Sequence, residues 1–386
     1  MKVAFLSGST HKIPRLGGEA RIYFMAKCLA ASGIQVDLFG STFSDELIGP
    51  NMSQSRSFRG WSGGDWYPIS ARGIPTVVKN APSLVHQNSV LQGYDAIISE
   101  LGSAWQGLCL KPVNRLPMVL NEHNVEWHLM RQQEQSLGRP FPWRRLRVYE
   151  KVCHATFDNV VVVSELDRDI FEADGTPGRK ITVVPNGVDL DTFSPAAGPR
   201  REVRARYQLE EETPLLMYMG SMKFFPNVDA VSSLLDVIYP RARTLVPNLR
   251  LMLTGPGYED AKVSIPKDVI LTGSVEHFSM PPYINASDIC VAPLRYGSGT
   301  RHKIIEWMAC GKPIIATRKA VEGIEVTSGD NLILEDNLDQ YPSLISNLWR
   351  DPLLRNRLGE NARVFVEKTY GWEACVAPLE RFLRSV

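Results

Sequence analysis

The sequence predicts an α/β protein made of two domains, each built on a doubly wound parallel sheet covered by helices. Its 386 residues are more than one ordinary core serves, and they suit two domains. Short apolar runs rich in Val, Ile and Leu alternate with longer helical patterns almost throughout the chain. The alternation breaks once, over residues 186–214, where prolines and mixed charge replace any apolar period, and it then restarts.

The first half contains five predicted strands that are apolar on both faces, as expected for a covered parallel sheet. They are Val3–Ser7, Gln35–Phe39, Ala96–Ser99, Met118–Leu120 and Val160–Val163. Helical patterns lie between them at Glu19–Ala31, Trp143–Phe157 and Glu165–Phe171. Ser164, followed three residues later by Asp167, predicts a capping box at the start of the last of these helices.

The second half repeats this order after a short predicted helix at Glu202–Tyr207. Its expected strands are Leu215–Met219, Arg250–Leu253, Val269–Thr272, Ile289–Ala292, Pro313–Ala316 and Asn331–Leu334. Its expected helices are Val228–Ile238, Ser279–Asn285, Thr300–Cys310, Asp339–Arg350 and Pro352–Lys368. Because ligands of such sheets bind beyond the carboxyl ends of the strands, functional residues should follow strands directly.

The composition argues against several classes of protein. A formal charge of +1 gives no support to nucleic-acid binding, and the six scattered cysteines form no zinc-type pairs. The chain shows neither a signal peptide after Met1 nor an apolar run long enough to span a membrane. We therefore expect a soluble, cytoplasmic protein.

Two polar segments follow strands in the first half. Gly17 and Gly18 precede a helix, so the backbone there could approach an anionic ligand closely, or the pair could form a plain turn. Glu122, His123 and Asn124 follow the strand Met118–Leu120. They offer donors, acceptors and a proton carrier at the sheet edge, although a single histidine is often structural.

Two more segments follow strands in the second half. Ser221 and Lys223 come after the first strand, where Lys223 could face a diphosphate or be a solvated surface lysine. The strongest candidate is Ala292–Thr317, in which a glycine-rich loop leads into a helix. Loop amides, the helix dipole and two cations together form an anion cradle, and a nearby carboxylate could accept from ribose hydroxyls. These residues are Gly297, Ser298, Gly299, Thr300, Arg301, Lys303 and Glu306.

At this last segment the chain resembles glycosyltransferase family 4, whose enzymes have the GT-B fold. The resemblance rests on GSGTRHKIIEWMACGKPIIAT and on six motifs that precede it in the chain. In chain order, these are NEHNVE, VVVVSELD, VPNGVD, GSMKFFPN, LTGPG and ASDICVAPL. It implies two Rossmann-like domains that face a central cleft. The expected acceptor-side domain is 1–190, with a C-terminal helix at 372–386 crossing back to it, and the expected donor domain is 191–371.

The resemblance also implies a chemistry: retaining, metal-independent transfer from a nucleotide-diphosphate sugar, most simply UDP-linked. It assigns the diphosphate loop to Gly297–Arg301, the ribose contact to Glu306 and the nucleobase edge to Ser274–Val275. The sugar-contacting histidine maps onto His123, and the N-terminal glycine loop maps onto Gly17–Gly18. The GSGTR form is similar to enzymes of polysaccharide and surface-glycan synthesis.

Two departures from the family pattern matter. The first glutamate of the usual pair is replaced by Ser298, and the usual arginine after the first strand of the donor domain is replaced by Ser221 and Met222. Positive charge would then come from a nearby basic residue. The candidates are Lys223, Arg295, Arg301 and Lys303.

Two alternatives and one further partner remain open. The missing glutamate allows a catalytically degenerate nucleotide-sugar-binding protein, and the architecture also allows a nucleotide-sugar 2-epimerase. The segment Arg139–Tyr149 mixes arginines with aromatic residues, so it could rest on anionic lipid beside a lipid-linked acceptor, or it could be a solvated helix face.

Overall fold

The computed structural model describes residues 1–7, 12–15, 17–41, 43–55, 89–138, 140–260 and 263–386. They form two compact units. Unit 1 comprises Met1–Pro185 and Trp372–Val386, and unit 2 comprises Asn186–Gly371. Unit 1 ends its first segment at Pro185, five residues before the boundary at residue 190 that the sequence predicts. The boundary between the functional domains stays a prediction. Among the described residues, no helix is both long and apolar enough to cross a membrane.

Unit 1 contains a seven-stranded parallel sheet in the order β3-β2-β1-β4-β5-β6-β7. The order reverses direction between β1 and β4, which makes that point the switch of a doubly wound sheet. The strands are β1 Lys2–Leu6, β2 Gln35–Phe39, β3 Met52–Ser55, β4 Ala96–Glu100, β5 Met118–Asn121, β6 Asn159–Val162 and β7 Ile181–Val183. The helices are α1 Gly17–Ala31, α4 Ala104–Leu110, α5 Glu126–Leu137, α6 Trp143–Thr156, α7 Glu165–Ala173 and α15 Trp372–Arg384.

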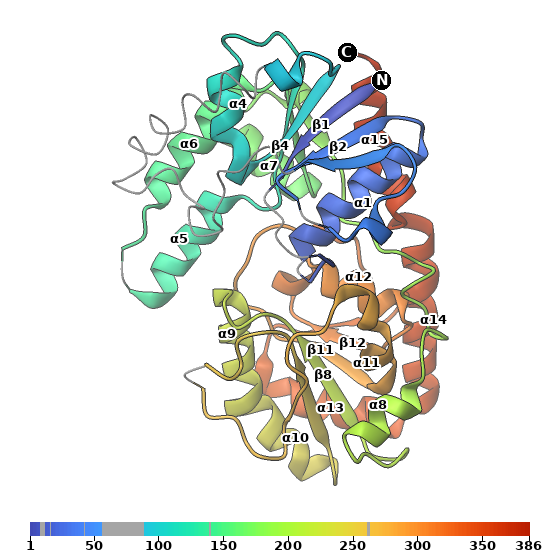
Figure 1. Ribbon diagram of the computed structural model, residues 1–386. Coiled ribbons are helices and arrows are strands. Elements are labelled where there is room, and N and C mark those ends of the chain that lie inside the picture. Colours follow the sequence, from blue (N-terminus) through green and yellow to red (C-terminus); the bar gives the residue numbers. More distant parts are fainter. Residues whose placement is uncertain (8–11, 16, 42, 56–88, 139, 261–262) are drawn as a thin grey trace. The chain divides into compact units, whose positions relative to one another are not determined.

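Helices cover both faces of this sheet. Helices α1 and α15 pack together on one side, whereas α4 and α6 lie on the other (Figure 1). The rings of Phe24 and Trp372 stack with their centroids 5.4 Å apart, which joins α15 to α1. The predicted cap is confirmed, because Ser164 Oγ accepts a hydrogen bond from the backbone N–H of Asp167 at 3.1 Å.

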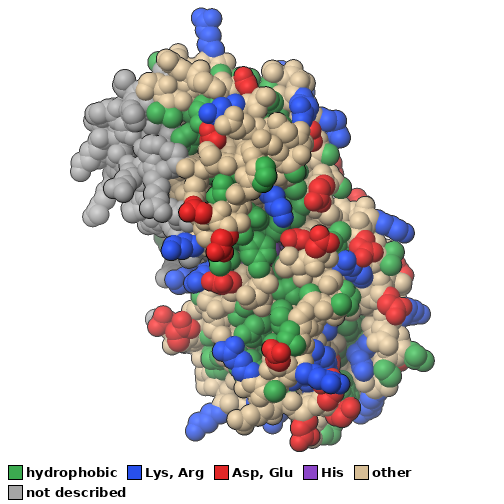
Figure 2. All heavy atoms as spheres, turned by 45° about the vertical axis from the view of Figure 1, so that its right-hand side comes forward, with side chains coloured by type: hydrophobic (Ala, Val, Ile, Leu, Met, Phe, Trp, Pro, Cys, Tyr) green, Lys and Arg blue, Asp and Glu red, His purple; other side chains and the backbone are tan. Residues whose placement is uncertain are grey.

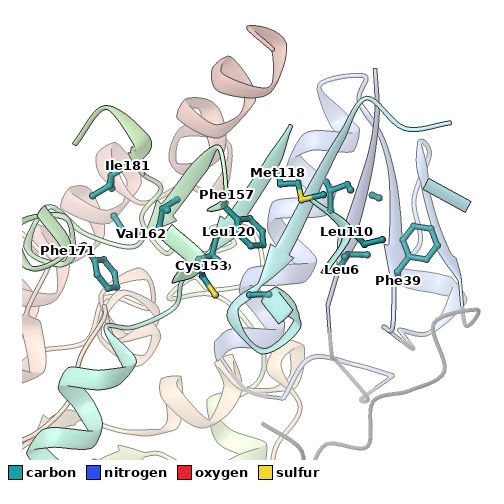
Figure 3. Packing of buried hydrophobic residues seen from close by; sticks show 14 of the residues in the cluster. Leu6, Phe39, Leu110, Met118, Leu120, Cys153, Phe157, Val162, Phe171 and Ile181 are labelled. Carbon is teal, nitrogen blue, oxygen red and sulfur yellow. The ribbon is translucent and has the colours of Figure 1, made fainter. Parts of the chain in front are cut away.

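The core of unit 1 lies between its sheet and helices, as Figure 3 shows. Strands β4, β5 and β6 are buried along their whole length, because helices leave neither face open to water. The side chains that meet in this core include Leu6, Phe39, Leu110, Met118, Leu120, Cys153, Phe157, Val162, Phe171 and Ile181.

Unit 2 contains a six-stranded parallel sheet in the order β10-β9-β8-β11-β12-β13. Both expected sheets of a GT-B protein are therefore present. The strands are β8 Leu215–Met219, β9 Arg250–Thr254, β10 Ile270–Leu271, β11 Ile289–Ala292, β12 Ile314–Ala316 and β13 Ile333–Leu334. The helices are α8 Arg200–Arg206, α9 Phe225–Ser233, α10 Tyr239–Leu245, α11 Pro281–Ala286, α12 His302–Ala309, α13 Tyr341–Arg350 and α14 Pro352–Thr369.

Two details of unit 2 differ from the sequence prediction. The helix expected over Val228–Ile238 contains a π-helical turn at Leu234–Ile238 before α10 begins. The helix expected to start at Thr300 begins at His302, because Arg301 still has extended backbone angles. On the surface, basic and acidic side chains are interspersed over the face drawn in Figure 2, in keeping with the near-zero net charge.

Candidate functional site

In unit 1 the structure brings His123, which follows the carboxyl end of β5, to the glycines that open α1. An ideal Cβ added to Gly18 would lie 3.0 Å from Nδ1 of His123, closer than real Cβ contacts ordinarily come. The absence of a side chain at Gly18 therefore lets the imidazole lie against the first turn of α1. The structure thus brings Gly18 and His123 together, and Gly17 opens the same helix.

His123 also pairs with a residue that the sequence analysis missed. Its Nε2 contacts Oε2 of Glu100, the last residue of β4. The other carboxylate oxygen of Glu100 accepts from Nδ2 of Asn121 at 2.9 Å. Glu100 is 8% exposed. A glutamate at the carboxyl end of an apolar strand was a usable signal for a site residue.

Asn121 is held in turn by Arg21, a buried residue of α1 that is 1% exposed. The guanidinium donates to Asn121 Oδ1 at 3.0 and 3.2 Å and to the carbonyl of Val184 at 2.9 Å. Burial lowers the pKa of Arg21 to about 10, so it remains a cation at neutral pH. The sequence carries no local sign of this role, since an arginine in an amphipathic helix is normally solvated.

The structure does not bring Glu122 to this group. Its carboxyl group is 1% exposed and lies 3.3 Å from Nε2 of His154 on α6. The physical reason is alternation: Glu122 N–H still donates to the carbonyl of Val161, so the chain remains extended and successive side chains point to opposite sides. Burial, followed by repulsion from Glu150, raises the pKa of Glu122 well above its ordinary value.

Asn124 contacts the helix that follows it. Its amide donates to Oε1 of Glu126 at 2.8 Å in the first turn of α5. Burial raises the pKa of Glu126, and the hydrogen bond from Asn124 opposes that rise. Asn124 is thus engaged with its own helix start.

In unit 2 the glycine-rich loop is supported from behind by Arg301. The guanidinium donates to the carbonyl of Ser298 at 3.1 Å, to the carbonyl of Gly299, and to the carbonyl of Lys319 at 3.3 Å. Gly297 has φ +139°, and a Cβ there would lie 2.2 Å from a guanidinium nitrogen of Arg301. The positive φ favours glycine at this position, and a side chain there would displace the guanidinium.

This arrangement has a consequence for the loop amides. The carbonyl and N–H of one peptide point in opposite directions. Because the carbonyls of Ser298 and Gly299 face Arg301, the N–H groups of Gly299 and Thr300 face away from it. The loop is further fixed where Asn186 Nδ2 donates to Thr300 Oγ1 at 2.8 Å. Outward N–H groups at the start of a helix form an anion-binding surface.

Lys303, in the first turn of α12, places its ammonium group beside the end of β8. Its Nζ lies 3.0 Å from Oδ1 of Asn227 and 3.1 Å from the hydroxyl of Tyr218, and 4.2 Å from the centre of the Tyr218 ring. Burial, followed by repulsion from Arg301, lowers the pKa of Lys303 to about 7. Asn227 also donates to the carbonyl of Ser221 at 3.0 Å, so Lys303 is connected to the loop after β8.

Glu306 lies one turn further along α12 and is 5% exposed. Burial raises its pKa to about 8, an effect that Lys303 opposes. His277 lies beside it, with Nδ1 3.6 Å from Oε1. Burial lowers the pKa of His277 to about 4, so near pH 7 the histidine is neutral and adds no positive charge beside Glu306.

The other predicted donor-side residues occupy the rim of unit 2. Lys223 is exposed, and Ser221 and Val275 are partly exposed. Arg295 is bound to Asp229, with Nε 3.0 Å from Oδ2, so its charge is already compensated. Of the four basic candidates, Lys303 combines proximity to the glycine loop with neutral hydrogen-bond partners.

Profiles of known families match both halves of the chain. The profile described as "Glycosyltransferase Family 4" matches residues 16–192, and the one described as "Glycosyl transferases group 1" matches residues 213–351. The chain is 26% identical over 266 residues to a D-inositol 3-phosphate glycosyltransferase of Xylanimonas cellulosilytica, covering 64% of this chain and 61% of that one. It is 23% identical over 246 residues to a lipopolysaccharide 1,2-N-acetylglucosaminetransferase of Salmonella typhimurium, covering 58% and 62%. The match thus spans about three fifths of each relative.

Solved structures show the same fold over the full length. Sucrose-phosphate synthase from Thermosynechococcus elongatus superposes with a TM-score of 0.76 at 20% identity, covering 100% of this chain and 98% of that one. HepE from Anabaena, crystallised with UDP and glucose, superposes with a TM-score of 0.75 at 17% identity, covering 100% of both chains.

Proposed function

The chain belongs to glycosyltransferase family 4, and we propose that it moves a sugar from a nucleotide-diphosphate sugar onto a glycan, lipid-linked or small-molecule acceptor. This proposal rests on the glycine-rich loop before α12 and on the first turns of that helix. Outward amides of Gly299 and Thr300, the ammonium of Lys303 and the carboxyl of Glu306 follow one another there. A diphosphate needs amides and a cation, and an adjacent ribose needs a buried acceptor.

The transfer we propose is retaining and requires no metal ion. The bond between the anomeric carbon and the β-phosphate oxygen breaks while the acceptor oxygen bonds to the same face of that carbon. The acceptor proton passes to the departing phosphate oxygen. Loop amides and Lys303 stabilise the charge that develops on the diphosphate. Full activity in excess chelator would support metal independence, and loss restored by Mg²⁺ or Mn²⁺ would contradict it.

A uridine donor is the form we favour. HepE was crystallised with UDP and glucose, and its fold extends over the whole of this chain. The segment Ser274–Val275, in which Ser274 is exposed and Val275 partly exposed, would lie at the edge of the nucleobase. A thermal-shift series with UDP, GDP, ADP and their sugar conjugates tests this choice, because a ligand at 100 times its Kd adds about 2.7 kcal/mol of stability.

The decisive variant is Glu306→Gln, which keeps the shape of the side chain but removes the carboxylate. At about pH 9, above the Glu306 pKa of about 8, we expect UDP affinity measured by calorimetry to fall at least tenfold, since a neutral amide offers one acceptor to two ribose hydroxyls. The matched control is Glu325→Gln, at an exposed glutamate of the same unit. Unchanged UDP affinity in Glu306→Gln would refute the ribose assignment.

Ser298 supports one alternative, a protein that binds nucleotide sugars without transferring them. Ser298 stands where the family pattern has its first glutamate, so the loop has no carboxylate at this position. Ser298 is 7% exposed, and its carbonyl faces Arg301. Donor turnover by the wild-type protein, with acceptor or water, would exclude this alternative. Tight donor binding without any turnover would favour it. Conversion of the donor to an epimer without acceptor would instead identify a 2-epimerase.

We also propose that helix α6 contacts an anionic membrane surface. The exposed side chains of this helix are of basic and apolar types: Arg144, Arg145, Val148, Lys151, Val152 and Ala155. Val148 and Val152 are 61% and 48% exposed, so this face of the helix presents apolar surface among its basic side chains. Arg139, at the start of the predicted patch, lies outside the described residues.

Vesicle flotation tests the membrane contact. Vesicles containing phosphatidylglycerol should carry the wild-type protein up a gradient, whereas Arg144→Gln/Arg145→Gln should stay at the bottom. The control Arg357→Gln/Lys368→Gln removes the same charge from exposed positions on α14. Equal flotation of both variants would contradict a specific role for α6.

A further inference from the structure

We propose that Glu100 is a positioning residue that holds His123 in the tautomer protonated at Nε2, and that Arg21 and Asn121 fix this arrangement. The inference rests on the proposed function, in which His123 contacts the transferred sugar. It adds a defined hydrogen-bonding state of the imidazole and three residues that set it.

The argument begins with the orientation of the Asn121 amide. Arg21 is a donor at every nitrogen, and it lies 3.0 and 3.2 Å from the side-chain oxygen of Asn121. The amide oxygen must therefore face Arg21. The amide nitrogen of Asn121 then faces Glu100 as a donor, at 2.9 Å from Oε1.

The second step concerns the carboxylate of Glu100. An ionised carboxylate only accepts hydrogen bonds, so the His123 nitrogen that contacts Oε2 must carry a proton. The Asn121 amide lies 3.3 Å from the same histidine nitrogen. Because both groups are then donors, that approach is a packing contact rather than a hydrogen bond.

The third step concerns charge. Glu100 is nearly buried, and a buried carboxylate is costly unless donors and positive charge compensate it. Asn121 and His123 supply the donors, and the buried Arg21 cation attracts Glu100 through Asn121. These donors and this cation compensate the charge of the Glu100 carboxylate.

The remaining nitrogen, Nδ1, then carries a lone pair while the ring is neutral. It faces Gly18, whose missing side chain lets the ring lie there without a clash. A group that meets Nδ1 must donate a hydrogen bond, and a sugar hydroxyl does so. The orientation thus defines what His123 offers to the substrate.

The test is ¹⁵N NMR of histidine-labelled protein without substrate. The His123 signal is assigned by its loss in His123→Gln. In the wild type we expect the pattern of a neutral ring protonated at Nε2. In Glu100→Gln, one amide oxygen faces two donors, so a substantial population should move to the Nδ1-protonated tautomer.

Kinetics provide the second readout. Glu100→Gln should lower kcat by about 100-fold, the scale of a misplaced catalytic group, with little change in donor KM. In a His123→Ala background, Glu100→Gln should have almost no further effect. A merely structural role would lower activity by the same factor in both backgrounds and leave the tautomer unchanged.

Two results would overturn the inference: a wild-type ring protonated at Nδ1, or equal tautomer populations in wild type and Glu100→Gln. If Glu100→Gln fails to fold, the wild-type spectrum still decides the question. The spectrum needs no turnover, so a protein without transferase activity but with the Nε2-protonated ring would refute the proposed function alone.

Discussion

Replacing Lys303 with methionine should change the stability of the protein in opposite directions at neutral and alkaline pH. Burial lowers the pKa of this ammonium from its ordinary 10.5 to about 7. The folded state therefore binds the proton less tightly than the unfolded chain does. The resulting cost is absent above pH 10.5, grows as the pH falls, and is complete near pH 7.

The difference between 10.5 and about 7 corresponds to an upper limit of about 5 kcal/mol. Lys303 is partly exposed, and screening by solvent reduces this figure to about 2 kcal/mol. Methionine also loses the hydrogen bonds to Tyr218 and Asn227, together worth about 1 kcal/mol. The variant should thus be about 1 kcal/mol more stable at pH 7 and about 1 kcal/mol less stable near pH 10.5.

The assay is thermal unfolding of wild type and Lys303→Met at intervals between pH 7 and pH 10.5. The sign of the Tm difference should reverse within this window, with a total change of roughly 4–8 °C for a unit of this size. Lys368→Met, at an exposed lysine on α14, should give a Tm difference that does not vary with pH. A Tm difference for Lys303→Met that is constant across the window would refute the reasoning.

Four further outcomes follow from the same contacts. Gly297→Ala combines a positive φ with a clash, so it should lower Tm and UDP affinity more than Gly329→Ala, which has φ +82° but no neighbour within 4 Å; equal losses would show that strain alone matters. Arg301→Lys keeps the charge but loses the fork that binds two carbonyls, so UDP affinity measured by calorimetry should fall nearly as far as in Arg301→Gln; full retention would indicate a direct phosphate contact. Glu122→Gln removes a carboxyl whose folded pKa lies above its unfolded one, so its Tm relative to wild type should rise as the pH increases above 4.5, and a flat difference would contradict the burial argument. Gly18→Ala should displace the His123 ring, lowering the transfer rate with UDP affinity retained; an unchanged rate would separate the ring from the reaction.

The sheets were the most predictable part of the fold. Covered parallel strands are apolar on both faces, and this pattern is read directly from Val, Ile and Leu. Helix α5 was missed because Glu126–Leu137 contains few apolar residues. Its start is stabilised from elsewhere in the sequence: Glu150 on α6 accepts from the backbone N–H groups of Glu126 and Trp127 at 3.0 and 3.3 Å. Local propensity cannot reveal a cap supplied by another helix.

The site shows the same limit in a different form. Residue types after strands identified His123, Lys303 and Glu306, because position at a sheet edge is a sequence property. The direction in which a side chain points is set by tertiary contacts. Glu122 therefore counted as a neighbour of His123 in the sequence, whereas in the structure it faces His154. Glu100, distant in the sequence, takes the place beside His123.

The two units use buried arginine in the same way. Arg21 binds the carbonyl of Val184 and the amide oxygen of Asn121, and Arg301 binds carbonyls of the glycine loop. In each unit a guanidinium with several fixed donors satisfies oxygens that would otherwise be buried without partners, and it thereby fixes the orientation of the neighbouring amides. In the function proposed above, a smaller group meets the ligand, His123 in unit 1 and Lys303 in unit 2. A lysine suits that place because its ammonium is a compact charge on a flexible side chain, and because burial shifts its pKa toward neutrality. The negative charge of an arriving diphosphate would favour the protonated form of this lysine. Arg301 is bound to loop carbonyls and Arg295 is paired with Asp229, so a count of basic residues in the sequence overestimates the cations available to a donor.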